Sequence, residues 1–169
     1  MSIHPEKSNK RKFLGRSKGF TLVEALVTLV ILSTALGPSL ILTSNISKTS
    51  TRTKNNLIAA NLAQEGVEVI RSIRDTNWFT GNSFDQGLAD GSYRVEWDSA
   101  SVMAMSSNPP LKESGGLYGY TSGVDTLFKR TVSIYKANSS ELRVISEVTW
   151  PERGVDRSVK IESHLFNWK

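Results

Sequence analysis

The chain has 169 residues, a formal net charge of +5, two histidines and no cysteine. This length allows one small domain beside a membrane segment and excludes two sizeable hydrophobic cores. The lack of cysteine excludes disulfides, iron–sulfur clusters and thiolate metal sites, and having only His4 and His164 excludes a multi-histidine metal cluster.

The basic excess lies entirely in residues 1–19, a polar stretch without hydrophobic periodicity that we interpret as a leader. It carries six basic side chains against the single acid Glu6, whereas residues 20–169 carry fifteen charges of each sign. The basic isoelectric point therefore does not indicate a nucleic-acid-binding domain. A short basic segment before an apolar run is expected to stay in the cytoplasm while the following chain crosses the membrane.

Residues 20–42 form an apolar run that contains one charged side chain, Glu24. A helix of this length, at ~1.5 Å per residue, crosses a ~30 Å hydrocarbon core. A carboxylate inside lipid costs about 3 kcal/mol unless it is neutralised or paired. We therefore expect a membrane segment here, with Glu24 as a candidate functional residue.

Gly37 and Pro38 interrupt the apolar run. Proline removes one backbone hydrogen bond and crowds the preceding turn, so a kink or a short melted stretch is expected there. Three hydroxyl side chains lie close enough in the sequence to bind the freed carbonyls, namely Ser33, Thr34 and Ser39.

An amphipathic pattern follows, and neither glycine nor proline interrupts residues 43–53. Its apolar face is formed by Ile58, Leu62, Val69 and Ile73 with Ala59, Ala63, Gly66 and Ile70 beside them, opposite Lys54, Asn61, Gln64, Glu68, Arg71 and Asp75. We expect one helix of about 55 residues, on the order of 80 Å long. It should end near residues 75–77, where polar turn formers take over.

The C-terminal part predicts an antiparallel sheet. Residues 77–125 carry turn signals and are expected to be irregular, apart from an alternating stretch at Ser92–Ser99. Three alternating runs follow, joined by short turns at 138–140 and 151–154, and they are Leu127–Ala137, Glu141–Trp150 and Val155–Trp168. They predict a meander with one apolar face, which the apolar face of the helix can cover.

The expected fold class is therefore α+β, with a long kinked N-terminal helix packed by its second half on a C-terminal antiparallel sheet. The chain divides into a leader, a membrane and assembly half of the helix, an amphipathic half, and a globular sheet domain. Their bounds are residues 1–19, 20–45, 46–76 and 77–169.

The stretch GFTLVEALVTLVIL resembles the class III signal of type IV pilins and pseudopilins. The resemblance implies that a membrane-embedded prepilin peptidase cuts between Gly19 and Phe20 and N-methylates Phe20. It also implies that Glu24 pairs with the methylated amine of Phe20 on a neighbouring subunit, which would set the register of assembly. The long helix followed by an antiparallel sheet is similar to the pilin fold.

Two further stretches are similar to minor pilins or pseudopilins of the V/I type, and they are AANLAQEGVEVIRSIRDTNW and VTWPERGVDRSVKIESHLFNW. The absence of cysteine departs from the major pilins whose C-terminal loop is closed by a disulfide. A minor subunit is therefore the expected role.

Two alternatives to this processing remain open. A secretory signal peptidase could cut after Ala35-Leu36-Gly37, although Pro38 would then follow the scissile bond and disfavour cleavage. The segment could also be an uncleaved anchor in which Glu24 lies near the membrane interface.

Three other groups of residues are candidate sites. His164 lies in an alternating strand, and Ser158 or Asp156 are too generic as partners to indicate a catalytic triad. Four polar residues after the helix could bind calcium, although they lack the D-x-D-x-D-G spacing, and they are Asp75, Asn82, Asp85 and Asp90. Aromatic residues could form a binding surface but are expected to fill the small core, and they are Trp78, Phe79, Phe84, Trp97, Tyr118 and Tyr120.

The sequence thus predicts a structural, non-enzymatic protein that uses no cofactor or metal. Its expected partners are the prepilin peptidase, other pilin or pseudopilin subunits and the lipid of the cytoplasmic membrane, with the leader inside and the domain outside before assembly into a filament. Nucleic acid is not an expected partner, because residues 20–169 are formally neutral and show no basic cluster. The alternative function is a membrane-anchored surface or DNA-binding module that is not polymerised.

Overall fold

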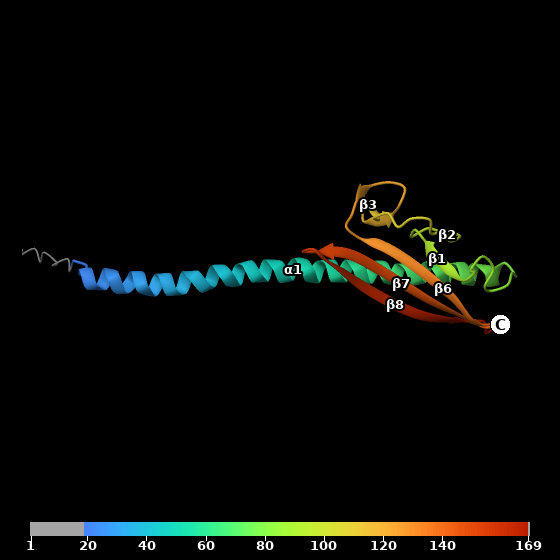
Figure 1. Cartoon of the computed structure of the whole chain (residues 1–169), viewed down its shortest axis with the longest axis horizontal. Coiled ribbons are helices and arrows are strands. Elements are labelled where there is room, and N and C mark those ends of the chain that lie inside the picture. The colour runs from blue at the N-terminus through green and yellow to red at the C-terminus, as the bar shows by residue number, and fades with distance from the viewer. Residues whose placement is uncertain (1–18, 169) are drawn as a thin grey trace, which may run out of the picture. The chain divides into compact units, whose positions relative to one another are not determined.

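The computed structural model describes residues 19–168, so most of the predicted leader, with His4, lies outside the described residues. The chain divides into two compact units, Met1–Ser47 and Lys48–Lys169. Helix α1, Leu22–Phe79, begins in the first unit and ends in the second (Figure 1). The predicted long helix is confirmed, and it ends at Phe79 rather than near residues 75–77.

The part of α1 in the first unit is a continuous helix with no buried residue. Its helical hydrogen bonding is assigned across Gly37 and Pro38, so the melted stretch is not seen, and a kink there stays a prediction. The expected hydroxyl groups bind carbonyls inside the helix. Thr34 donates to Val30 and Ile31, and Ser39 donates to Ala35. These bonds satisfy the hydroxyl groups without water, as an apolar surrounding requires.

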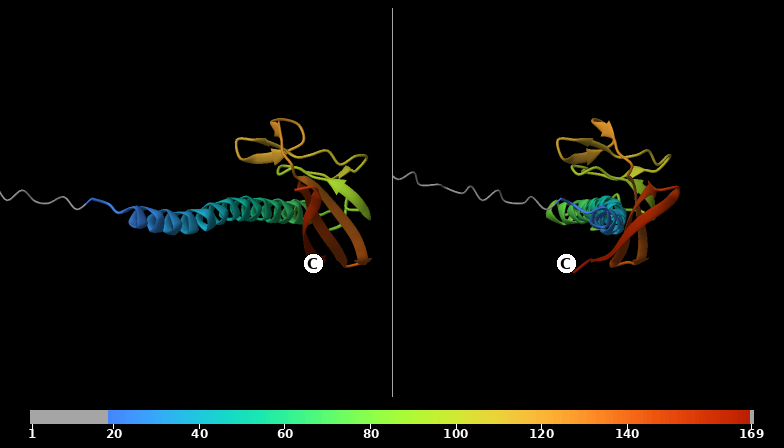
Figure 2. Two further views of the ribbon diagram at one scale, coloured as in Figure 1. Left: turned by 60° about the vertical axis from the view of Figure 1, so that its left-hand side comes forward. Right: turned by 90° about the vertical axis from the view of Figure 1, so that its left-hand side faces the viewer.

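The second unit contains a five-stranded antiparallel sheet in the order β2-β1-β6-β7-β8. Its strands are β1 (Gly91–Arg94), β2 (Met103–Ala104), β6 (Lys129–Asn138), β7 (Glu141–Glu152) and β8 (Val155–Phe166). The predicted meander is confirmed as β6-β7-β8, which lies against the second half of α1 (Figures 1 and 2). The α+β fold class is therefore confirmed.

The region 77–125 is more ordered than predicted. A second sheet has three short antiparallel strands in the order β4-β3-β5, and they are β3 (Lys112–Ser114), β4 (Leu117–Gly119) and β5 (Val124–Asp125). The strand predicted at Ser92–Ser99 is assigned only as Gly91–Arg94. Strands of two or three residues are too short to show a period of two, so alternation could not predict them.

The predicted apolar face of α1 covers the sheet. The most deeply buried positions form the row of small and branched residues at its centre, and they are Ala59, Ala63 and Ile70 at 0% exposure. Two clusters form the core. One surrounds Val132 and Leu142 and the other surrounds Phe128 and Trp150. α1 contributes to both clusters, and its stretch from Leu62 to Gly66 lies where they meet.

Gly66 permits the close approach of α1 to the sheet. A Cβ atom at this position would lie 2.5 Å from Ser146 Oγ, 3.1 Å from Val132 Cγ2 and 3.2 Å from Arg130 Cδ. Ser146 is itself fully buried, and its hydroxyl has no hydrogen-bond partner within the described chain. The space beside Gly66 is thus filled from the sheet side.

Gly66→Ala is expected to destabilise the domain by about 1–2 kcal/mol, because overpacking at this contact outweighs the gain of about 1 kcal/mol in helix propensity. The measurement is the urea-unfolding midpoint of the detergent-solubilised chain, followed by tryptophan fluorescence. The added change Ser146→Ala should recover most of the loss, because it removes the nearest atom and an unsatisfied hydroxyl. A net stabilisation by Gly66→Ala alone would show that the contact relaxes.

Arg130 lies on the core face of β6, where the alternation with Val132 and Ile134 predicts an apolar residue. Its guanidinium is fully buried and donates to Leu62 O at 3.0 Å, to Val95 O at 2.6 Å and to Glu65 Oε1 at 2.7 Å. A buried charge is tolerated only with such partners. Arg130 therefore joins three separate segments of the chain at the point where the two core clusters meet.

A second buried arginine holds the end of β8 to the end of α1. Arg74 is 3% exposed, donates to Phe166 O at 3.1 Å, and lies 4.3 Å from the ring centre of Trp78 and 5.0 Å from that of Trp168. The indole of Trp78 also donates to Asn167 Oδ1 at 3.2 Å. These contacts explain why α1 continues past the predicted turn formers, since its last turn is needed to bind the C-terminal residues.

Candidate processing and assembly segment

Gly19 and Phe20 precede the first turn of α1, which begins at Leu22. Both residues are exposed, with Phe20 at 71%, and nothing lies within 4 Å of the position that a Cβ of Gly19 would take. The peptide bond between them is therefore in non-helical, accessible chain. A peptidase can reach such a bond without unfolding a helix.

Thr21 caps the start of α1. Its side-chain oxygen accepts the backbone N–H of Glu24 at 3.2 Å, and its carbonyl accepts the N–H of Ala25 at 3.0 Å. The spacing Thr-x-x-Glu is that of a capping box, in which the acidic residue stands in the first helical turn. This second role of Glu24 was not predicted from the sequence, although the Thr21-x-x-Glu24 spacing carries the signal.

Glu24 is exposed and, within residues 19–168, makes no ion pair. Its place in the first turn favours a negative charge there by about 0.3–1 kcal/mol through the helix dipole. This is less than the cost of about 3 kcal/mol for a carboxylate at the centre of a bilayer. The helix dipole alone therefore does not offset the cost of placing a carboxylate at that depth.

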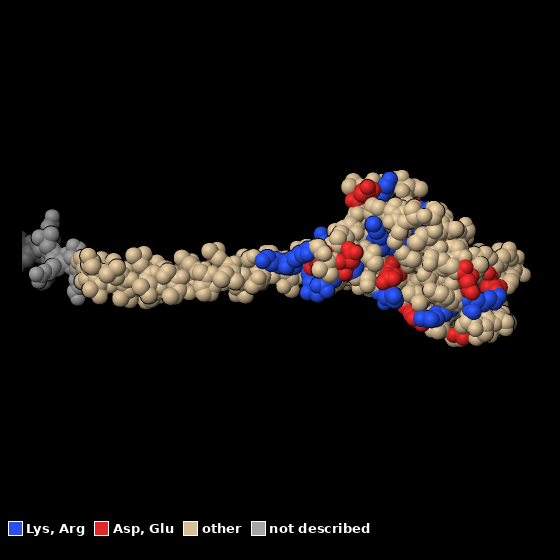
Figure 3. All heavy atoms as spheres, in the orientation of Figure 1, with Lys and Arg blue, Asp and Glu red and all other residues tan. Residues whose placement is uncertain are grey.

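The apolar part of α1 is long and apolar enough to cross a membrane, and none of it is buried. The face seen in Figure 3 shows no Lys, Arg, Asp or Glu along this part of α1. A helix that is apolar all round needs lipid or other protein as its surrounding. Lipid or the apolar helices of other proteins would meet this need.

His164 is exposed on β8 and belongs to a surface network. Its Nδ1 lies 2.6 Å from Glu141 Oε1 and its Nε2 lies 3.2 Å from Glu162 Oε1, and the hydrogen bond to Glu141 raises the pKa of the imidazole. Ser158 lies six residues away on the same strand, a distance of about 20 Å along an extended chain. The structure therefore does not bring the weighed triad together.

The residues weighed for calcium have other partners. Lys136 pairs with Asp85, which lowers the pKa of that carboxyl, and its backbone N–H donates to Asp90. Asp75 lies inside α1, where it pairs with Arg74 at 2.6 Å, and not in the following loop as predicted. Within residues 19–168 no group of three or more acidic or histidine side chains is placed to hold a metal ion.

The aromatic residues divide between core and surface. Phe84 is 3% exposed and belongs to the core, and Trp78, Tyr118 and Tyr120 pack partly buried against it. Burial raises the pKa of the Tyr120 hydroxyl, which donates to Arg130 O at 3.3 Å. The prediction that the aromatic residues fill the core is wrong for two of them, because Phe79 is 93% exposed and Trp97 is 50% exposed.

Comparison with known proteins finds a match for the N-terminal segment alone. A family model described as the prokaryotic N-terminal methylation motif matches residues 14–40, which include Gly19, Phe20 and Glu24. No curated protein and no solved structure matches the chain. With an exposed apolar helix and a C-terminal antiparallel sheet behind this motif, the chain resembles a precursor of the type IV pilin and pseudopilin family.

Proposed function

We propose that the protein is a minor structural subunit of a type IV pilus, a competence pilus or a type II secretion pseudopilus. The precursor inserts in the cytoplasmic membrane with the leader inside and the C-terminal domain outside. Prepilin peptidase then cuts between Gly19 and Phe20 and methylates Phe20, and the subunit polymerises through residues 20–45. The methylation motif matched at residues 14–40 is the observation that carries this proposal.

The geometry of the first turn supports a role for Glu24 in assembly. A methylated amine on Phe20 of a neighbouring subunit is the cation that Glu24 lacks within the described chain. A subunit out of register would leave both charges unpaired in an apolar bundle, so the pair selects the correct register. The unburied apolar surface of α1 is then covered by the helices of other subunits.

Intact mass and N-terminal sequencing of the mature protein test the processing step. The expected species begins with N-methylated Phe20, and Gly19→Glu, which places a charged side chain beside the scissile bond, should leave most of the chain uncleaved in the membrane. Gly19→Ala is the matched conservative control and should be cut more slowly, not blocked. A mature protein that begins at Met1 or at Pro38 contradicts the proposal.

A second candidate function is a membrane-anchored binding module that is not polymerised. The exposed aromatic side chains Phe79 and Trp97 favour it, because such residues often supply the contact area of a recognition surface. The two functions differ in where the mature protein is found. A filament subunit is recovered with sheared filaments, and an anchored module stays in the membrane fraction.

A further inference from the structure

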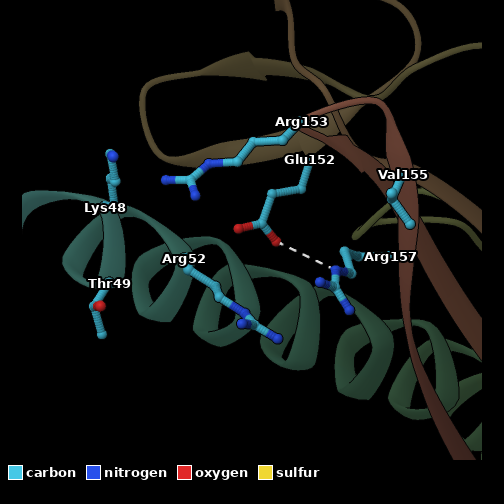
Figure 4. A pocket seen from close by; sticks show the side chains of 7 residues that line it. All are labelled: Lys48, Thr49, Arg52, Glu152, Arg153, Val155 and Arg157. Carbon is cyan, nitrogen blue, oxygen red and sulfur yellow. Dashed lines mark ion pairs between the residues drawn. The ribbon is translucent and has the colours of Figure 1, made fainter. Parts of the chain in front are cut away.

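A basic hollow of about 200 Å³ lies between the start of the second unit's helix and the β7–β8 hairpin (Figure 4). Lys48, Thr49 and Arg52 line it from α1, and Glu152, Arg153 and Arg157 line it from the hairpin. Four cations and one carboxylate thus line it. A site of this charge and size suits a single anionic group and is smaller than typical pockets for drug-sized ligands, which are about 300–1,000 Å³.

The carboxylate in the hollow does not neutralise it. Glu152 pairs with Arg157, whose Nε lies 3.6 Å from its Oε2 (Figure 4). Within residues 19–168, the other three cations have no ion-pair partner, and they are Lys48, Arg52 and Arg153. Since clustered unpaired cations repel one another, the hollow favours an anion from outside the chain.

Arg153 is held in the hollow by a strained backbone. Its φ is 53° and that of Gly154 is 78°, and Glu152 pairs with Val155, so these two residues form the hairpin turn. A turn of this kind prefers asparagine, aspartate or glycine at the position of Arg153. The turn therefore carries an arginine where another residue would fold better, and its guanidinium extends over the hollow between Lys48 and Glu152 (Figure 4).

The sequence places this hollow close to a membrane surface. Lys48 lies six positions after Leu42, where the apolar run ends. From Phe20 to Lys48 a helix rises by roughly 42 Å, and a bilayer with its headgroups is about 40–45 Å thick. Cations just outside the exported end of a membrane segment oppose the usual bias that keeps Lys and Arg in the cytoplasm. Their position is that of the headgroup phosphates.

We infer that the hollow binds the headgroup phosphate of an anionic phospholipid in the outer leaflet of the cytoplasmic membrane. The guanidinium groups of Arg52 and Arg153 and the ammonium of Lys48 supply charge-assisted donors, and Thr49 supplies a hydroxyl. A second copy of the chain fits less well, because two carboxylates on the outer face of α1, Glu68 and Asp75, already pair with arginines of their own chain. The inference rests on the proposed membrane insertion. It adds that lipid holds the domain at the membrane until the subunit is withdrawn into the filament.

The test uses the full-length precursor in zwitterionic detergent, titrated with short-chain phosphatidylglycerol, phosphatidylcholine or inorganic phosphate. The backbone amide resonances of Arg153 and Gly154 report binding. Phosphatidylglycerol is expected to bind, Arg153→Asn or Lys48→Gln should each weaken it about fivefold, and the double variant by about 25-fold. Lys54→Gln removes the same charge from α1 outside the hollow and should leave binding unchanged.

Arg153→Asn separates binding from folding, because asparagine relieves the turn strain and its melting temperature should equal or exceed that of the wild type. Equal binding of inorganic phosphate or phosphatidylcholine overturns the lipid assignment, as does a Lys48 cross-link between two copies without lipid. Failure of the wild type to stay in carbonate-washed membranes overturns the proposed insertion together with this inference. Retention without a preference for phosphatidylglycerol overturns this inference alone.

Discussion

Glu24→Gln is expected to keep the subunit out of filaments while membrane insertion and cleavage at Gly19 continue. Glutamine keeps the size of the side chain but removes the charge, so the methylated amine of Phe20 on the neighbouring subunit has no anionic partner. Breaking a buried pair by removing one partner costs about 3–5 kcal/mol, which lowers incorporation by at least about a hundredfold. Insertion should not suffer, because a neutral side chain enters lipid more easily than a carboxylate.

Shear fractionation followed by immunoblotting measures the incorporation, with membrane retention and N-terminal sequencing as checks on the same cells. Thr21→Ala is the matched control, because it removes the capping oxygen at a cost of about 1 kcal/mol and leaves the charge of Glu24 intact. If Thr21→Ala loses incorporation into filaments to the same extent as Glu24→Gln, capping is the main role of Glu24. Wild-type protein that never leaves the membrane fraction supports the unpolymerised module instead.

Arg130→Ala is expected to destabilise the globular unit by about 3–5 kcal/mol, because it removes a buried cation from Glu65 and leaves a cavity between the two core clusters. This is a large share of the stability of a domain of this size, about 5–15 kcal/mol. The variant should therefore unfold at a much lower urea concentration. Tryptophan fluorescence reports the transition, since Trp150 is 2% exposed in the same core.

Two variants control this experiment. Arg130→Met fills most of the same volume with an apolar side chain and should retain more of the stability than Arg130→Ala. Arg143→Ala removes an exposed arginine that pairs with Glu162 at 2.7 Å on the sheet surface, and it should change the midpoint little. A midpoint for Arg130→Ala close to that of Arg143→Ala would show that the buried arginine is not a major support of the fold.

The long helix and the three long strands of the fold could be predicted from local patterns in the sequence. The apolar run and the 3.6-residue period predicted α1, and the period of two predicted β6, β7 and β8, because each pattern repeats over ten residues or more. The exact ends of these elements could not be predicted from the sequence. The turn predicted at residues 151–154 is only Arg153–Gly154, since β7 continues through Pro151 and Glu152, which pair with β8 beyond the end of β6.

The N-terminal segment could be predicted almost entirely from the sequence, whereas the globular surface could not. Gly19, Phe20 and Glu24 lie within six residues of one another, so their spacing can be read without knowledge of the fold. The basic hollow brings Lys48 and Arg153 together from positions about a hundred residues apart in the chain, a proximity that follows from the pairing of β7 with β8 and their packing on α1. No local spacing carries that information.

By itself, the sequence predicted an apolar helix long enough to cross a membrane, an N-terminal methylation motif that a family model matches at residues 14–40, and the helix-then-sheet order, because hydropathy and periodicity are local properties of the chain. Only the tertiary structure decided that Arg130 and Arg74 are buried, that Phe79 and Trp97 stay exposed, and that three cations with no ion-pair partner among residues 19–168 share a hollow with Glu152. The physical reason is that a charged side chain is buried only where carbonyl and carboxylate partners converge on it, and such partners come from segments that only the folded chain brings together.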